Sequence, residues 1–318
     1  KILNWYDLNK RSLPWRKNAS IQKRQYYTLV SEFMLQQTQV ATVIPYFNRF
    51  IKNIPSLKVL SKVQNKKLIK LWEGLGYYSR ARNLKKTAQV IIKKFKGKLP
   101  DNFEDLISLP GIGNYTSSAI LAIAFNKPYI PLDGNIERVL KRYLYLKNDK
   151  EIQKKNLIQK KTIFGTSLRS DDYAQALMEL GAIICKPTNP LCNRCPIPKK
   201  CKSFKKKDFN LAKNIKKNKE KYFLLNVYKK DQKYLLIKNT KFNFLKNLII
   251  FPMDELTKSK NFNKNLNLKL SNMNMNIKIR YLKDIKKFHS PYWVDKKKLD
   301  NHMLPSFTKK IVKYLEKN

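Results

Sequence analysis

The hydrophobic and polar positions of residues 1–204 follow a helical period. Residues 135–144 carry apolar side chains on one helical face and basic side chains on the opposite face. Residues 117–125 are apolar on every side, a pattern typical of a fully buried helix. Prolines and glycines interrupt the pattern repeatedly, so short helices are expected. This region therefore predicts a mainly α-helical domain.

After residue 204 the pattern changes twice. Residues 205–221 are polar, rich in lysine and without a period, which predicts a linker. Residues 222–228 and 234–237 flank a Lys-Asp-Gln turn and predict a β-hairpin. Residues 222–318 thus predict a second, small α+β domain. Its other expected elements are strands around residues 248–251 and 277–281 and a helix at residues 306–316.

The composition is consistent with two domains and a nucleic-acid partner. A chain of 318 residues with 42% hydrophobic residues has enough apolar material for two cores. No apolar run approaches the roughly 20 residues of a membrane span, so a soluble, cytoplasmic protein is expected. The 68 basic and 22 acidic residues give a formal charge of +46, which favours a polyanion. Lysine and asparagine are abundant everywhere, as in chains from AT-rich genomes, so the charge needs the support of motifs.

All four cysteines lie within 17 residues, in the spacing Cys185-x6-Cys192-x2-Cys195-x5-Cys201. Four thiolates form a complete ligand set for a [4Fe–4S] cluster or for a structural zinc ion. Paired disulfides are the weaker interpretation, because no secretory signal precedes Lys1 and disulfide scaffolds carry more cysteine. The wide spacings of six and five residues favour the bulkier [4Fe–4S] cluster over zinc.

A tight turn at residues 109–113, with the sequence Leu-Pro-Gly-Ile-Gly, joins two helical stretches. Gly111 and Gly113 allow close backbone approach, and the following helix presents its N–H groups as an anion site. This pattern predicts a helix-hairpin-helix, which grips a DNA phosphate without reading sequence.

Two carboxylates are candidates for chemistry. Asp133 lies in a turn that begins the basic helix, a position well suited to an ordinary N-cap. The two roles are compatible, because a helix N-terminus also holds a carboxylate fixed and ionised. Glu32 interrupts a largely apolar helical run. If it points outward it is solvated, but in a pocket its pKa would rise and suit a general acid.

Five segments together resemble the MutY-type adenine DNA glycosylases, members of the helix-hairpin-helix superfamily that also contains endonuclease III. They are residues 31–40, 74–83, 109–113, 132–135 and the cysteine set. The similarity runs in order through residues 1–204 and continues more faintly to the C-terminus. It implies a helical glycosylase domain at residues 1–204, a linker at 205–221 and a Nudix-like lesion-recognition domain at 222–318.

The resemblance implies excision of a flipped-out adenine mispaired with 8-oxoguanine or G. By this resemblance, Glu32 would protonate the departing adenine. Asp133 would stabilise the cationic sugar, assisted by Asn135 and Tyr115. Tyr115 occupies the position where bifunctional members have a lysine nucleophile, so a monofunctional glycosylase is expected.

The resemblance also implies contacts to the substrate and a structural metal. Gln37 and Tyr77 would wedge into the duplex, and Gly111 and Gly113 would hold its backbone. Trp15 and Arg16 would form part of the adenine pocket, although the stretch between Arg16 and Glu32 is about four residues longer than usual. The four cysteines would hold one [4Fe–4S] cluster in a basic loop that contacts the DNA backbone.

The C-terminal domain lacks the glutamate-rich box of a Nudix hydrolase, which argues against pyrophosphatase activity. By position, the family's Phe-Ser-His lesion-reading loop is Leu270-Ser271-Asn272 here, so only Ser271 is kept. The Trp-Gly-Gly segment expected near residues 245–247 is also missing. Weaker discrimination of the lesion is therefore expected.

We expect a monomer that acts on double-stranded DNA, does not bind membranes and is associated with the nucleoid. One alternative is an endonuclease III-like pyrimidine glycosylase and lyase, which Tyr115 and the C-terminal domain disfavour. Another is a non-catalytic iron–sulfur DNA-binding protein, which would need neither Glu32 nor Asp133.

Overall fold

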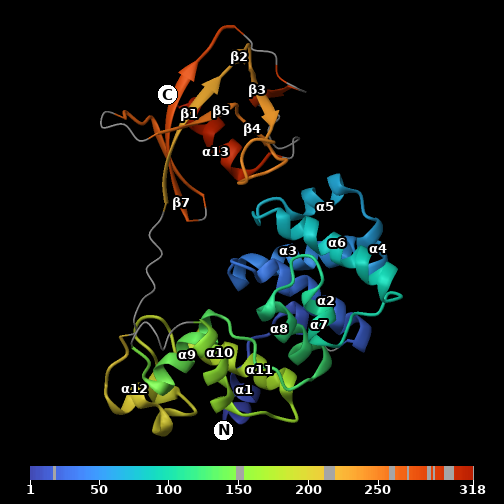
Figure 1. Cartoon of the computed structure of the whole chain (residues 1–318), viewed down its shortest axis with the longest axis vertical. Coiled ribbons are helices and arrows are strands. Elements are labelled where there is room, and N and C mark those ends of the chain that lie inside the picture. The colour runs from blue at the N-terminus through green and yellow to red at the C-terminus, as the bar shows by residue number, and fades with distance from the viewer. Residues whose placement is uncertain are drawn as a thin grey trace. The chain divides into compact units, whose positions relative to one another are not determined.

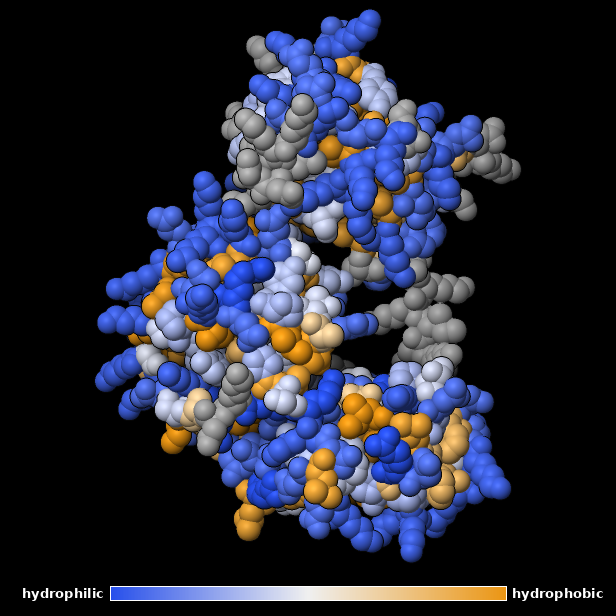
Figure 2. Space-filling model, turned by 180° about the vertical axis from the view of Figure 1, so that it is seen from behind, coloured by the Kyte–Doolittle hydropathy of each residue, from blue (hydrophilic) through white to orange (hydrophobic). Residues whose placement is uncertain are grey.

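A computed structural model describes residues 1–16, 19–147, 154–210, 219–257, 262–270, 272–284, 288, 291–296 and 304–317. The chain forms two compact units, of which the first comprises residues 1–65 and 79–213 and the second residues 66–78 and 214–318 (Figure 1). None of the described helices is both long and apolar enough to cross a membrane. Hydrophilic side chains cover most of the face seen in Figure 2.

The first unit is helical, as predicted. Its elements are α1 (Ile2–Asn9), η1 (Pro14–Arg16), α2 (Ile21–Leu35), α3 (Val40–Asn53), α4 (Leu57–Lys62), α6 (Ser79–Lys94), α7 (Phe103–Ile107), α8 (Asn114–Phe125), α9 (Gly134–Leu144), α10 (Lys154–Lys160), η2 (Lys161–Phe164), α11 (Ser170–Glu179), η3 (Leu180–Ile184), η4 (Cys192–Arg194), η5 (Pro198–Lys200) and α12 (Lys202–Lys205).

The α8 helix packs against α2, α7 and α11. Eight of its residues are buried, because nearly every position is small or apolar and α2 and α11 pack against it. The predicted all-round burial is therefore confirmed. The α9 helix has the predicted amphipathic pattern, with Ile136, Val139 and Leu140 among its buried residues.

The second unit contains α5 (Asn65–Trp72), two four-stranded sheets and the C-terminal helix α13 (Ser306–Leu315). One sheet has the order β5-β1-β7-β6, and in the other β3 pairs with β2, β4 and β8. The strands are β1 (Lys219–Val227), β2 (Lys229–Lys230), β3 (Lys233–Lys238), β4 (Ile249–Ile250), β5 (Met253–Leu256), β6 (Leu266–Leu270), β7 (Met273–Tyr281) and β8 (Tyr292–Asp295).

The predicted hairpin between residues 222–228 and 234–237 is wrong in its strand pairing. The turn is present, but only the short β2 pairs with β3 across it. The long β1 strand instead pairs antiparallel with β5 and parallel with β7 in the other sheet. A parallel partner about 50 residues away leaves no local signal in the sequence, whereas a turn does.

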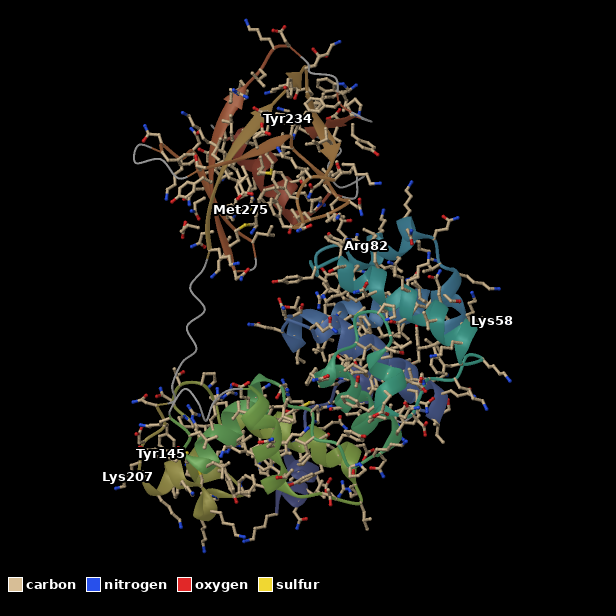
Figure 3. All side chains as sticks on the ribbon, in the orientation of Figure 1. Lys58, Arg82, Tyr145, Lys207, Tyr234 and Met275 are labelled. Atoms are coloured by element: carbon tan, nitrogen blue, oxygen red, sulfur yellow. The ribbon has the colours of Figure 1, made fainter. Side chains whose placement is uncertain are left out.

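The core of the second unit lies between the two sheets and α13. Met275 from one sheet and Tyr234 from the other are both buried in it (Figure 3). The predicted terminal helix and the later strands are present, and β1 begins inside the predicted linker, at Lys219. Residues 211–218 of that linker are outside the described part of the chain.

Candidate active site

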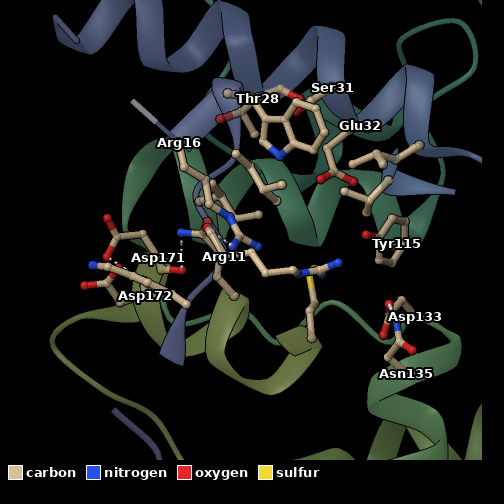
Figure 4. Close-up of a pocket in the computed structure, with 18 of the residues that line it drawn as sticks. Arg11, Arg16, Thr28, Ser31, Glu32, Tyr115, Asp133, Asn135, Asp171 and Asp172 are labelled. Atoms are coloured by element: carbon tan, nitrogen blue, oxygen red, sulfur yellow. Dashed lines mark hydrogen bonds between the residues drawn. The ribbon is translucent and has the colours of Figure 1, made fainter. Parts of the chain in front are cut away.

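A cavity of about 1100 Å³ opens in the first unit between α2, α8, α9 and α11. Its lining includes most of the residues that the sequence singled out for catalysis and base binding (Figure 4). These are Trp15, Arg16, Glu32, Tyr115, Asp133 and Asn135, and the lining also includes Gln37, which was assigned to duplex contacts. They come from five separate segments, so tertiary packing brings them together.

Glu32 points into the cavity from α2 (Figure 4). Its side chain is almost completely buried, at 4% exposure, because the apolar run around it packs against α8. Burial raises the pKa of this carboxyl group to about 7, with a smaller rise from the nearby Asp133. Its Oε2 atom has no hydrogen-bond partner among the described residues. The structure thus places Glu32 inward, with a proton available near neutral pH.

Tyr115 lies between the two carboxylates in Figure 4 and comes from the first turn of α8. Its hydroxyl group is near enough to Glu32 to oppose part of the rise in the pKa of that carboxyl group. Burial raises the pKa of Tyr115 itself well above its usual value. The phenol therefore remains neutral and can donate a hydrogen bond.

Asp133 is the N-cap of α9, as predicted. Its Oδ1 atom accepts a hydrogen bond of 2.7 Å from the backbone N–H of Ile136. Burial raises the pKa of Asp133, and the hydrogen bonds from Ile136 and Asn135 lower it in part. The N-terminus of α9 thus holds the carboxylate in place. Burial raises the pKa of Asp133 by more than these hydrogen bonds lower it.

The two carboxyl groups have different environments and can divide the chemistry between them. Glu32 has an unsatisfied oxygen in a buried site, whereas both oxygens of Asp133 accept hydrogen bonds. Such a pair can supply one proton and one negative charge at the same pH. This is the arrangement that cleavage of a glycosidic bond requires.

Asn135 is held by Asp133 and by two residues that the sequence did not single out, Arg138 and Gly181. Its amide donates to Oδ2 of Asp133 at 2.9 Å, and its Oδ1 accepts from Arg138 at 2.8 Å. Arg138 also donates to the carbonyl oxygens of Gly181 and Cys185. A Cβ atom on Gly181 would lie 2.5 Å from Cβ of Asn135, so glycine is required for this close packing.

A buried ion-pair cluster that includes two arginines of the cavity lining was also missed. Glu179 of α11 is completely buried and binds Arg16 at 2.7 Å and Arg11 at 2.7 Å. Trp15 precedes Arg16 in η1 and packs edge-on against Phe47, with ring centroids 5.3 Å apart. A charged residue inside an apolar helical run was the available signal for Glu179, as it was for Glu32.

The four residues assigned to DNA contacts lie in turns. Gln37 follows α2 and is exposed, whereas Tyr77 belongs to residues 66–78 of the second unit and is 42% exposed. Gly111 has φ +82°, and a Cβ atom there would lie 2.8 Å from Cβ of Asn83. Gly113 is the N-cap of α8, with no described atom within 4 Å of an added Cβ. No side chain caps the described N-terminus of α8, so its N–H groups can bind an anion.

The four cysteine thiols are free and partly buried around η4, η5 and α12. The described residues contain no group of three or more His, Cys, Asp or Glu side chains placed as ligands of one metal ion. The thiols are nevertheless near enough to interact: burial raises the pKa of Cys192, and the neighbouring Cys185 and Cys201 add to the rise.

The surroundings of the thiols suit a sulfur-rich cluster. The backbone N–H groups of Ser203 and Phe204 lower the pKa of Cys201 in part, and Arg142 lies 3.4 Å from the sulfur of Cys185. The hydroxyl group of Ser203 is buried and has no hydrogen-bond partner in the described part of the chain. Donors directed at the sulfurs are typical of iron–sulfur sites, so these residues fit such a group. Ser271, assigned to lesion recognition, lies outside the described residues.

The sequence has clear relatives. Residues 30–162 match the HhH-GPD superfamily of base excision DNA repair proteins. The adenine DNA glycosylase of Buchnera aphidicola subsp. Baizongia pistaciae is 43% identical over 262 residues, covering 79% of this chain and 72% of that protein. The human adenine DNA glycosylase is 39% identical over 213 residues, covering 64% of this chain and 38% of that protein.

Solved structures resemble about two thirds of the chain. A thermostable thymine-DNA glycosylase has a TM-score of 0.56 and 28% identity, covering 64% of this chain and 94% of that one. Endonuclease III in a non-covalent DNA complex has a TM-score of 0.53 and 21% identity, covering 65% of this chain and 94% of that one. The latter likeness establishes the helical fold alone.

Proposed function

The chain belongs to the adenine DNA glycosylases, DNA N-glycosylases of base excision repair, and from this premise we propose how its own residues carry out the reaction. The observation that carries the proposal is the cavity in which buried Glu32 and capped Asp133 lie together. The cavity is large enough to hold a base that has been flipped out of the duplex.

Glu32 is the general acid. Its carboxyl group donates a proton to N7 of adenine as the bond between N9 and C1′ breaks, and the bonding electron pair leaves with the base. The resulting carboxylate then accepts a proton from the water that adds to C1′. The products are free adenine and an abasic sugar, and Glu32 regains its proton. A pKa of about 7 suits both steps near neutral pH.

Asp133 stabilises the positive charge that develops on the sugar. Its carboxylate is fixed by the N-cap hydrogen bond and by Asn135, so it needs no rearrangement as the charge forms. Tyr115 has a neutral hydroxyl group that can donate to Glu32, and it cannot form a Schiff base with the sugar. Tyr115 therefore supports a monofunctional glycosylase.

The remaining contacts hold the base and the duplex. Trp15 and Arg16 line the far side of the cavity, where a flat base can be sandwiched and its edge bound. Gln37 and Tyr77 enter the duplex, and the turn with Gly111 and Gly113 binds a phosphate through the N-terminus of α8.

Cys185, Cys192, Cys195 and Cys201 hold one [4Fe–4S] cluster, which organises the loop between η3 and α12. When bound, the cluster supplies structural cross-linking and no catalytic step. Arg138 and Arg142 of α9 contact the backbone of this loop, at Cys185 and at Lys186. The loop thereby supports the helix whose first residue follows Asp133.

If the four cysteines hold a [4Fe–4S] cluster, the purified protein has a defined content of iron and sulfide. Purified protein should contain about four iron atoms and four acid-labile sulfides per chain, with little zinc. One zinc ion per chain without acid-labile sulfide would instead show that the four cysteines form a structural zinc site. Metal analysis and sulfide assay of the same sample distinguish these two outcomes.

The second unit recognises the lesion opposite the target adenine. Two sheets and a C-terminal helix support a Nudix-like fold, and the β6–β7 connection contains Ser271. The preferred substrates are A:8-oxoguanine and A:G mispairs in double-stranded DNA, so the enzyme acts at the nucleoid. Because the aromatic and imidazole partners of Ser271 are replaced, we expect a reduced preference for 8-oxoguanine over G.

One assay separates this function from its alternatives. The protein is incubated with duplexes that contain A opposite 8-oxoguanine, A opposite G, or thymine glycol. We expect cleavage of the adenine strand only after alkali treatment, because a monofunctional enzyme leaves an intact abasic site. Strand cleavage at thymine glycol without alkali would instead identify a pyrimidine glycosylase and lyase. Binding without any cleavage would indicate a DNA-binding protein.

A further inference from the structure

The turn at residues 36–38, which borders the cavity, has a backbone conformation that its sequence disfavours. Gln37 has φ 58°, in the left-handed region that residues other than glycine, asparagine and aspartate rarely adopt. Its side chain is exposed at the cavity edge. Such a conformation persists only where the surroundings impose it, so neighbouring groups must hold the turn.

Arg80 of α6 is the group that holds it. The side chain is buried, at 6% exposure. Its Nη1 atom lies 2.6 Å from the carbonyl oxygen of Met34 and also donates to the carbonyl oxygen of Gln36. Its Nη2 atom lies 3.1 Å from Oγ1 of Thr38. One planar guanidinium group therefore contacts acceptors on both sides of Gln37.

These contacts also provide hydrogen-bond donors for the carbonyl groups at the C-terminal end of α2. The last carbonyl groups of a helix have no partners within it, and the helix dipole favours a cation at this end. Arg80 supplies both the donors and the charge, including a bond of 3.2 Å to the carbonyl oxygen of Phe33. Phe33 directly follows Glu32, so the same guanidinium fixes the helix end that carries the proposed acid.

The same helix positions the hairpin turn. Asn83 packs against Gly111, and Thr87 donates to the carbonyl oxygen of Pro110 at 2.8 Å. Gln36 closes the arrangement by donating to the carbonyl oxygen of Gly111 at 3.3 Å. Residues 80, 83 and 87 share one face of α6 because they are three and four positions apart.

We propose that Arg80 is a positioning residue for base flipping, which holds Gln37 in its left-handed conformation and fixes it relative to the hairpin turn. The inference rests on the proposed insertion of Gln37 into the duplex. A lysine has one point of donation where the guanidinium has a fork, so it cannot bridge Gln36 and Thr38 in the same way. Without the bridge, Gln37 relaxes toward ordinary backbone angles and its side chain leaves the duplex.

The test measures flipping separately from chemistry. The target adenine is replaced by 2-aminopurine, whose fluorescence rises when it leaves the base stack, and Arg80→Lys, Gln37→Ala and the double variant are compared. We expect each single change to lower the flipping equilibrium about tenfold, equal to about 1.4 kcal/mol. The double variant should be no worse than either single one, because both changes remove the same interaction. Arg169→Lys, which alters an arginine bound to Asp7 and Asp172, should leave the signal unchanged.

The results for the variants separate the positioning role of Arg80 from the insertion of Gln37 into the duplex, on which that role depends. Loss of flipping in Gln37→Ala but not in Arg80→Lys would overturn the role of Arg80 alone. Additive losses in the double variant would also overturn it, because Arg80 would then act independently of Gln37. Unchanged flipping in Gln37→Ala would remove the wedge role of Gln37, and the inference with it. Thermal unfolding of each variant identifies any loss caused by a general collapse of the fold.

Discussion

Adenine excision by the Glu32→Gln variant is expected to fall by about 10²–10⁴-fold, while binding to the mispair is retained. Glutamine has nearly the same shape as glutamic acid, but it cannot give a proton to the departing base. Single-turnover excision and equilibrium binding measured on the same duplex check the two parts of the result. A variant that excised adenine at the normal rate would show that another group is the acid.

Two comparisons make this result specific. Glu104→Gln, the same change on an exposed residue of α7, should leave excision unaffected. The rate of the unaltered enzyme should fall as the pH rises through about 7, because the acid loses its proton there. The pH profile of any residual activity in Glu32→Gln should lack this step.

The same substitution has a predictable effect on stability. The pKa of Glu32 is raised in the folded protein, so the folded state favours the protonated form, and that contribution is lost as the pH rises from about 4.5 through about 7. Glutamine never acquires the buried charge. The variant should therefore be more stable than the unaltered protein at pH 8, by roughly 3 kcal/mol at most, and equally stable at pH 4. Denaturant unfolding at the two pH values measures the difference.

The second large effect is expected for Asp133→Asn, which should lower excision by about 10²–10³-fold. Asparagine accepts the same N-cap hydrogen bond from Ile136 but has no negative charge to stabilise the cationic sugar. The free energy of unfolding should therefore change little. The loss of activity is then attributable to the charge and not to a damaged helix.

An alanine at position 133 separates the two roles further. Asp133→Ala removes both the cap and the charge, so it should lower stability by about 1 kcal/mol in addition to lowering the rate. If Asp133→Asn kept full activity while Asp133→Ala lost it, the carboxylate would be a helix cap alone. Single-turnover rates and unfolding free energies of both variants decide between these roles.

The sequence predicted local features well because their causes are local. The N-cap at Asp133 follows from a short polar side chain before an amphipathic helix, and the hairpin turn follows from Gly111 at a positive φ. The pairing of β1 could not be predicted in this way. Its alternation is compatible with several partners, and β7, the parallel partner found, lies about 50 residues further along the chain.

The missed residues have a common physical origin. Glu179, Arg138 and Gly181 act through partners that are distant in sequence, such as Arg11 for Glu179 and Asn135 for Gly181. No spacing rule relates such residues before the chain is folded. A buried charge in an apolar helical run is the clue that would have found Glu179, and the same clue did find Glu32.

Sequence alone was enough to establish the helical class of the first unit, the capped turn at Asp133, the hairpin glycines and the cysteine spacing. Each depends on residues a few positions apart, whose geometry the backbone sets. The inward orientation of Glu32 follows from the packing of the fold, because a helix with apolar residues on most sides can bury either face. Packing of α8 against α2 makes that choice, and the resulting loss of hydration raises the pKa of Glu32 to about 7.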